Sequence, residues 1–332
     1  MSLRGSGRAL VAALLLTAAV PALPQAPGTP GASLQPTTSP EERDAARLAL
    51  GQRLFFDPIL SLDRSISCAS CHKPEFAFAD NRPLSPGVDG KLGSRNTPTV
   101  MNASGRASLF WDGRAATLED QAVFPIENPV EMALPIAAAL QRLAAEPAYV
   151  KLFRTAYGGA ITARTVGRAL AAFQKTLETV DTPYDRYAHG DATAISESAV
   201  RGRLLFIGRG KCAECHSGED FTSERFRNIG LYDGVQLADP GRGAITGNAA
   251  ENGEFKIPTL RNVAVTAPYM HNGMFRSLRE VIDYYDEPDR FVPKAIGRDV
   301  TMLARLELSE QDRQDLEAFL EALTDDRFRA QK

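Results

Sequence analysis

The 332-residue sequence predicts a mainly α-helical fold made of two related units. Apolar residues recur at the spacing of one helix face, for example at Val166, Leu170 and Phe173. No segment shows the alternation of apolar and polar residues that is typical of half-buried strands. A segment that begins at residue 98 recurs 160 residues later, which indicates an internal repeat.

The two copies of the repeat align without gaps and share residues that shape turns and begin helices. Thr117 and its counterpart Ser277 each begin a segment with capping-box-like spacing, which predicts a helix start. We therefore expect an N-terminal unit over residues 39–185 and a C-terminal unit over residues 186–332. The other matching pairs are Pro98 and Pro258, Thr99 and Thr259, Asn102 and Asn262, Trp111 and His271, and Gly113 and Gly273.

Each unit is expected to open with a similar helix. The segments 51–55 and 202–206 both start with glycine and end with phenylalanine, and each precedes a pair of cysteines. The first of these helices has a capping signature at Ser39, followed by Pro40 and two glutamates.

The composition is that of an ordinary globular protein. Hydrophobic residues make up 44% of the chain and charged residues 24%, which excludes disorder and a multi-span membrane protein. The formal net charge is −3 and no long basic block exists, so no nucleic-acid partner is expected.

The first 26 residues have the order of a secretory signal peptide. Arg4 and Arg8 precede an apolar run at residues 10–20, and small residues follow. Residues 27–38 are rich in Pro, Gly, Ser and Thr, as in a flexible linker. A membrane-anchoring helix is the alternative, but the apolar run is short for a membrane span. We expect export to a bacterial periplasm.

All four cysteines lie in two C-x-x-C-H motifs, the attachment pattern of c-type haem. Two thiols one helical turn apart can bond the two vinyl groups of one haem, and the adjacent imidazole can bind its iron. A four-cysteine zinc site would leave both histidines unexplained, and a redox-active C-x-x-C pair does not need them. The sequence therefore predicts two covalently bound haems, held by Cys68, Cys71 and His72, and by Cys212, Cys215 and His216.

The repeat distinguishes the two haems by what lies opposite each histidine. The helix that begins after Ser277 places Ile282 and Tyr285 on one apolar face, with Tyr284 rotated about 100° away. Phenolate is an accepted haem ligand, whereas the counterpart of Tyr285 is Pro125, which cannot bind iron. We therefore expect the iron of the second haem to be six-coordinate and the iron of the first haem to have one free coordination position. A simple core role for Tyr285 is the alternative.

The sequence resembles the bacterial di-haem cytochrome c peroxidase family, including its MauG branch, over nearly all of residues 40–325. The resemblance is carried by both C-x-x-C-H motifs and by several further segments. These are residues 95–99, 110–114, 131–132, 258–262 and 266–271, together with Gln121.

Further site residues are implied by this resemblance. It places Gln121 and Glu131 in a peroxide pocket and makes Trp111 an electron relay between the haems. Without it, a loop glutamate would more often be solvated and a single tryptophan more often part of a core. The resemblance also implies a calcium ion held by Asn96, Thr266 and Pro268, the last two through main-chain carbonyl oxygens.

The sequence departs from the better-known peroxidases at two positions. Val88 stands where they carry a distal histidine on the first haem, and Tyr285 stands where they carry a methionine on the second. Both departures resemble MauG. They imply that no reductive step is needed to open the first haem.

The expected function is a periplasmic di-haem peroxidase that reduces hydrogen peroxide. Its electrons would come from a small donor protein, either a c-type cytochrome or a cupredoxin. Three alternatives are MauG-type oxidation of a specific protein substrate, a non-enzymatic electron-transfer cytochrome, and a haem-based sensor. The resemblance also makes a homodimer plausible.

Overall fold

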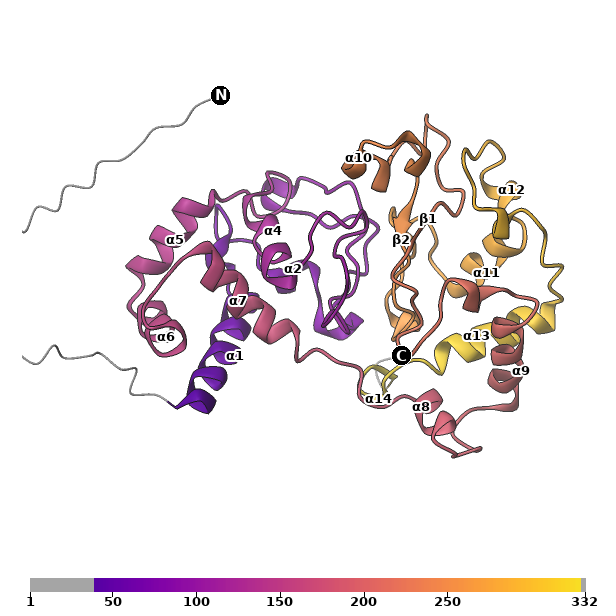
Figure 1. Ribbon diagram of the computed structural model, residues 1–332, viewed down its shortest axis with the longest axis horizontal. Coiled ribbons are helices and arrows are strands. Elements are labelled where there is room, and N and C mark those ends of the chain that lie inside the picture. The colour runs from indigo at the N-terminus through magenta and orange to yellow at the C-terminus, as the bar shows by residue number, and fades with distance from the viewer. Residues whose placement is uncertain (1–38, 330–332) are drawn as a thin grey trace, which may run out of the picture. The chain divides into compact units, whose positions relative to one another are not determined.

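The computed structural model describes residues 39–329, which are mainly helical as predicted (Figure 1). The expected signal peptide at 1–26 and linker at 27–38 lie outside these residues. Within residues 39–329, no helix has both the length and the apolar character that a membrane span requires.

Helices dominate both halves of the described chain. In the first half they are α1 (Pro40–Phe56), α2 (Cys68–Cys71), α3 (Leu118–Gln121), α4 (Phe124–Glu127), α5 (Ile136–Ala145), α6 (Pro147–Tyr157) and α7 (Ala163–Gln174). In the second half they are α8 (Pro183–Ala188), α9 (Glu197–Ile207), α10 (Arg242–Thr246), α11 (Leu278–Asp286), α12 (Pro288–Phe291), α13 (Glu310–Glu321) and α14 (Asp326–Arg329). One short antiparallel sheet pairs β1 (Phe226–Arg227) with β2 (Phe255–Lys256).

The predicted helix starts are confirmed by their capping hydrogen bonds. The Ser39 hydroxyl accepts from the Glu42 N–H at 3.1 Å, and the Glu42 carboxylate accepts from the Ser39 N–H at 2.7 Å. Thr117 and Ser277 cap α3 and α11 in the same way, each accepting a main-chain N–H three residues on. Such caps satisfy donors that would otherwise have no partner in the first turn.

Two close helix pairs, α1 with α7 and α9 with α13, form the framework of the two halves. Gly51 of α1 lies against the main chain of α7, where an added Cβ would come within 1.8 Å of the Ala169 carbonyl oxygen. Gly202 of α9 meets the Asp315 carbonyl oxygen of α13 at the same distance. A hydrogen atom is therefore the largest side chain that either helix crossing accepts.

Equivalent contacts recur at positions 160 residues apart. Leu109 forms a bridge with Ala115, and Tyr269 forms the same bridge with Phe275. The Thr99 hydroxyl donates to the Ala77 carbonyl oxygen at 2.5 Å, and the Thr259 hydroxyl donates to a main-chain carbonyl at 2.7 Å. The same turns are thus built twice, by residues that match in the sequence repeat.

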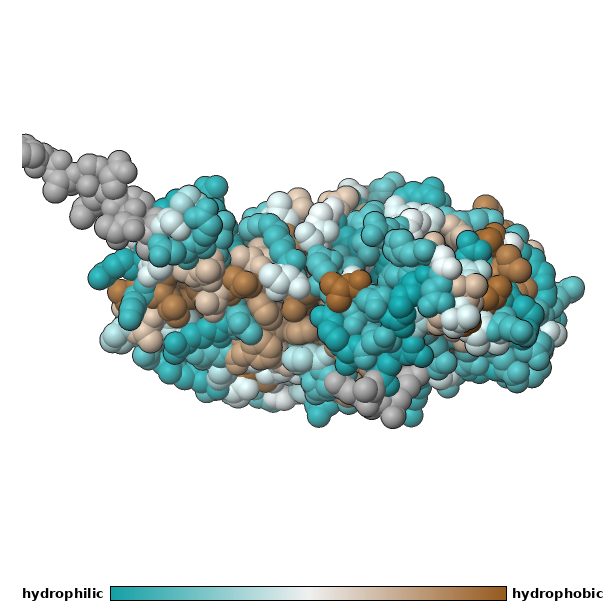
Figure 2. All heavy atoms as spheres, turned by 90° about the horizontal axis from the view of Figure 1, so that it is seen from below, coloured by the Kyte–Doolittle hydropathy of each residue, from teal (hydrophilic) through white to brown (hydrophobic). Residues whose placement is uncertain are grey.

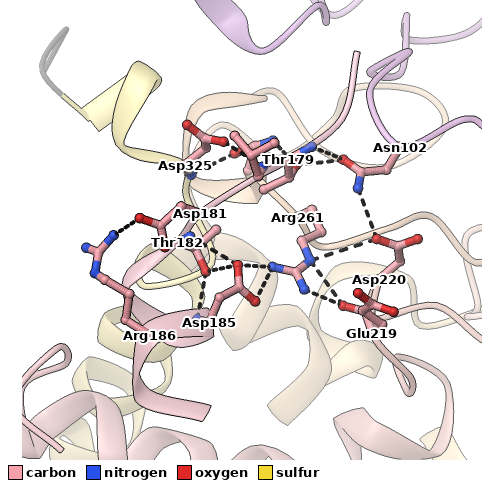
Figure 3. A network of polar contacts seen from close by, with 12 residues as sticks. Asn102, Thr179, Asp181, Thr182, Asp185, Arg186, Glu219, Asp220, Arg261 and Asp325 are labelled. Carbon is pink, nitrogen blue, oxygen red and sulfur yellow. Dashed lines mark hydrogen bonds and ion pairs between the residues drawn. The ribbon is translucent and has the colours of Figure 1, made fainter. Parts of the chain in front are cut away.

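A buried polar network joins the two halves near residues 179–185 (Figure 3). Asn102 accepts from the Thr179 hydroxyl at 2.6 Å and donates to Asp220 at 3.1 Å. The guanidinium of Arg261, which is 7% exposed, donates to both carboxylate oxygens of Asp185 at 2.7 Å. A buried cation is tolerated when it is paired and hydrogen-bonded in this way.

The surface is mixed in character. The face in Figure 2 carries hydrophilic residues over much of its area, with hydrophobic areas separated from one another. Phe124, on α4, is among the large apolar side chains that remain exposed, with 49% of its area accessible.

Replacing Gly51 with alanine should destabilise the protein by about 3 kcal/mol, because the new methyl group clashes with main chain that cannot move aside. Guanidinium unfolding of the holoprotein measures this loss. Gly93→Ala is the matched control, since the nearest atom to its added Cβ is 4.0 Å away. Equal stability of the two variants would contradict the close-packing argument.

Candidate active site

The first motif lines a cavity of about 530 Å³ in the N-terminal half. Cys68 and Cys71 lie one turn apart on α2, and His72 follows directly as its C-terminal cap. The His72 Nδ1 lies 3.1 Å from the Phe78 carbonyl oxygen. A carbonyl can only accept, so Nδ1 carries the proton and Nε2 is left free as a ligand.

The second motif lines a separate cavity of about 220 Å³. Cys212, Cys215 and His216 all contribute to its wall, and the His216 Nδ1 lies 2.9 Å from the Phe221 carbonyl oxygen. Burial lowers the pKa of His216 to about 4, which keeps the imidazole neutral. A neutral imidazole with one free nitrogen is the form that binds metal ions.

The donor chemistry of both cavities fits covalently attached haem. All four cysteines are free, and burial raises the pKa of Cys68 and of Cys212 to about 12, so both thiols are protonated. Each cavity therefore presents two thiols and one oriented imidazole. Within residues 39–329 no three His, Cys, Asp or Glu residues are grouped to hold a metal ion, which argues against the four-cysteine zinc alternative.

Tyr285 lies where the helix-face argument places it, in the wall of the second cavity. Burial raises the pKa of its phenol, so a phenolate here requires a compensating cation. Tyr284, which the same argument rotates away from this face, is also fully buried, and its hydroxyl donates to the Ile229 carbonyl oxygen at 2.6 Å. Helix α11 is covered on more than one face, which a single apolar stripe does not reveal.

Gln121, Pro125 and Glu131 all line the first cavity, together with His72. Burial raises the pKa of the Glu131 carboxyl, as a proton-transfer group near neutral pH requires. Val88 is buried beside this loop, and its N–H donates to the Glu131 carbonyl oxygen at 2.8 Å.

Asn128 is a site residue that the sequence argument missed. Its side-chain amide donates to Glu131 Oε1 at 2.6 Å and also lines the first cavity. This bond favours the charged carboxylate and so opposes the effect of burial on the Glu131 pKa. The only sequence signal was the spacing of three residues within a loop, which many exposed Asn–Glu pairs share.

An outer hollow of about 300 Å³ lies against the same wall. It shares Pro125, Asn128 and Glu131 with the first cavity, and its rim is formed partly by Phe110 and the exposed Phe124. These two rings meet edge to face with their centroids 5.7 Å apart. The hollow therefore brings solvent to Glu131 past the paired aromatic side chains.

Arg114 supports this rim from its inner side. The Arg114 guanidinium lies 3.5 Å from the centre of the Phe110 ring and bonds Asp112 at 2.8 Å. Its positive charge also lowers the pKa of Glu131, although burial is the larger effect.

Trp111 lines both cavities, and hydrogen bonds hold both its indole N–H and its main-chain carbonyl oxygen. Its indole Nε1–H donates to the Asn96 carbonyl oxygen at 2.9 Å, and its own carbonyl oxygen accepts from the Lys256 N–H at 2.7 Å. The ring thus has a defined place beside the wall that the cavities share.

The three residues implied for calcium line the second cavity together. The Asn96 amide donates to two main-chain carbonyls, those of Arg82 at 3.1 Å and Pro83 at 3.2 Å, which leaves its Oδ1 available. Among residues 39–329, no hydrogen bond is made to the main-chain oxygens of Thr266 and Pro268. Oxygen donors of this kind suit calcium.

Comparison with known proteins identifies the family. Residues 45–193 match the family described as di-haem cytochrome c peroxidase. Methylamine utilization protein MauG of Methylorubrum extorquens is 42% identical over 279 residues, covering 83% of this chain and 78% of that protein. The chain belongs to the di-haem cytochrome c peroxidase family. The resemblance predicted from the sequence motifs is confirmed.

Relatives in this family carry both peroxidase and MauG names. Cytochrome c551 peroxidase of Nitrosomonas europaea is 38% identical over 248 residues, covering 74% of this chain and 73% of that protein. A solved MauG-like protein associated with microbial copper homeostasis superposes with a TM-score of 0.78 at 32% identity, covering 85% and 90% of the two chains. The chain is accordingly an oxidoreductase of the peroxidase type, and its family implies two c-type haems.

Replacing Asn128 with alanine should raise the pKa of Glu131 further, because a hydrogen bond that favours the charged carboxylate is lost. If ionised Glu131 is required, the acidic limb of the rate profile for peroxide consumption moves to higher pH. Asn248→Ala is the matched control, since Asn248 bonds Glu251 at the same spacing on the surface. An unchanged profile in Asn128→Ala would contradict the assigned contact.

Proposed function

We propose that this protein is a periplasmic di-haem c-type peroxidase that reduces hydrogen peroxide with electrons from a small redox protein. The observation that carries the proposal is the first cavity, which His72 lines together with Gln121, Pro125 and Glu131. None of these three residues is a customary haem ligand, which supports a coordination position open to peroxide on the first haem. The family relatives named as peroxidases support this activity.

Haem iron in this cavity would supply the electrons and the metal centre for cleavage of the O–O bond. Glu131 accepts a proton from one peroxide oxygen and returns it to the other, so that the departing oxygen leaves as water. Its raised pKa suits both halves of that transfer. Asn128 holds Oε1 of the carboxylate, which leaves Oε2 for the proton.

Gln121 orients the peroxide through its side-chain amide, which can both donate and accept hydrogen bonds. The aromatic rim of Phe110 and Phe124 admits small solutes to this wall. Arg114 keeps Phe110 in place through its stacking contact.

We assign the covalent attachment of one haem to Cys68 and Cys71 and that of the other haem to Cys212 and Cys215. His72 and His216 are the proximal ligands, and Tyr285 is the distal ligand of the second haem. The units are residues 39–185 and 186–332, and the equivalent turns at offset 160 support their relation as an internal repeat. Trp111 is the electron relay between them, since it lines both cavities.

A calcium ion is proposed at Asn96, Thr266 and Pro268. The available amide oxygen of Asn96 and the two free main-chain oxygens support this assignment. Export by residues 1–26 and a homodimeric assembly complete the proposal, and both rest on the sequence argument alone.

MauG-type oxidation of a specific protein substrate is the second candidate function. The position of Tyr285 in the second cavity favours it, as does the 42% identity to a protein named MauG. A cytochrome that only transfers electrons would not require a proton-transfer group such as Glu131 in the first cavity. Peroxide-dependent oxidation of reduced cytochrome c or cupredoxin distinguishes the two enzymatic candidates, because a dedicated protein oxidant would turn over these donors poorly.

Replacing Glu131 with glutamine should slow the reaction with peroxide at least ~100-fold, because the proton shuttle is lost. Stopped-flow absorption after peroxide addition measures this rate. Glu127→Gln, which alters a second glutamate lining the outer hollow, is the control and should react normally. Full peroxide turnover by Glu131→Gln would rule out the proton role.

Replacing Tyr285 with phenylalanine should change the resting spectrum of one haem, because a phenolate ligand is removed. Electron paramagnetic resonance and visible absorption of the ferric protein measure the change. Tyr284→Phe should leave both spectra unaltered and lower the free energy of unfolding by about 1 kcal/mol, through loss of its bond to Ile229. Identical spectra for wild type and Tyr285→Phe would remove the ligand assignment.

A further inference from the structure

Two residues 160 positions apart make the same contact with the opposite half of the molecule. The Asn96 N–H donates to the His271 carbonyl oxygen at 2.7 Å, and the Lys256 N–H donates to the Trp111 carbonyl oxygen at 2.7 Å. His271 is itself the counterpart of Trp111. The main chain is therefore arranged by an approximate twofold relation, in which Lys256 takes the place of Asn96.

The same relation maps the proposed calcium site onto a second location. The counterparts of Thr266 and Pro268, at offset 160, are Arg106 and Ser108. The Lys256 ammonium donates to the Ser108 carbonyl oxygen at 2.8 Å. That oxygen corresponds to the Pro268 oxygen, which no hydrogen bond within residues 39–329 occupies.

We propose that the Lys256 ammonium is a tethered cation that fills the counterpart of the calcium site, so that one half of the molecule uses a metal ion where the other uses a side chain. The inference rests on the calcium site of the proposed function. It assigns Lys256 a positioning role: it holds β2 to the 106–108 segment beside Trp111.

The surroundings of Lys256 suit this role. Among the described residues, no ion pair within 4.0 Å involves Lys256, and its ammonium donates to the Ser108 carbonyl oxygen. The Glu224 carboxylate is the acidic group whose charge acts on the ammonium. The neighbouring Arg106 is itself paired with Asp220 and Glu224, at 2.9 and 2.7 Å. Removing an ammonium group from water costs free energy when its partner is an uncharged oxygen. If the partly buried Lys256 side chain served only to fill space, an apolar residue would do so at lower cost.

Charge explains why the two locations do not both bind calcium. An ammonium placed among the carbonyl oxygens repels a divalent ion and occupies the donor that the ion would need. The protein should therefore hold one calcium ion per chain, on the side of Asn96.

Exchanging residue types between the two locations tests the proposal. In Asn96→Lys, the introduced ammonium should replace calcium by bonding the Pro268 oxygen. The di-haem holoprotein of this variant should hold no calcium by elemental analysis after dialysis, and its melting temperature should not respond to EGTA. Wild type should hold one calcium ion and melt about 5 °C lower in EGTA.

Asn96→Ala is the matched control, because it removes the amide oxygen without supplying a cation. It should hold no calcium and melt at least about 5 °C below Asn96→Lys. Lys256→Met, which keeps the side-chain length without the charge, should also melt below wild type, with its calcium content unchanged.

Two results would overturn the inference: Asn96→Lys melting no higher than Asn96→Ala, or Lys256→Met matching wild type in melting temperature. A wild-type holoprotein without calcium would instead remove the calcium site of the proposed function. In that case the melting temperatures still show whether a cation at positions 96 and 256 stabilises the protein. The comparisons are Asn96→Lys with Asn96→Ala, and Lys256→Met with wild type.

Discussion

Both cavities depend on one recurring interaction, the bond from a histidine ring to a main-chain carbonyl shortly after the cysteine motif. In each half this bond places the proton on Nδ1 and leaves Nε2 as the ring nitrogen that can bind a metal ion. Burial lowers the pKa of both imidazoles and so favours the neutral form, an effect that the Asp80 charge partly opposes at His72. The carbonyls come from the turns at Phe78 and Phe221, so those turns set the orientation of everything built opposite each ring.

Function arises from differences placed on two similar frameworks. The same helix crossing, the same threonine-anchored turn and the same bridge occur in both halves. At one pair of matched positions, however, Pro125 lines the first cavity and Tyr285 lines the second. A proline offers no donor atom and leaves space, whereas a phenol offers an oxygen. The two halves therefore differ, at these matched positions, in the donor atom that they could offer to a haem iron.

The sequence was most informative where chemistry depends on local spacing. The cysteine motifs, the capping residues at Ser39 and Ser277, and the absence of long strands could all be predicted, because each is set by neighbours within one or two turns. Tyr284 could not, because its burial depends on the loop that carries Ile229 and is distant in sequence. Asn128 and Lys256 were missed for a similar reason. Their partners follow from loop conformation or from contact between halves, and neither leaves a periodic pattern.

The composition of the outer hollow bears on how long such a protein could survive its own oxidant. The described residues that line it are Phe110, Arg114, Phe124, Pro125, Glu127, Asn128 and Glu131. None of them carries a thiol or a thioether, the groups that peroxide attacks most readily, and none is a tyrosine or tryptophan. The methionines Met101 and Met132 line the inner cavity and not this hollow. The side chains that line the outer hollow can therefore meet peroxide repeatedly without being oxidised.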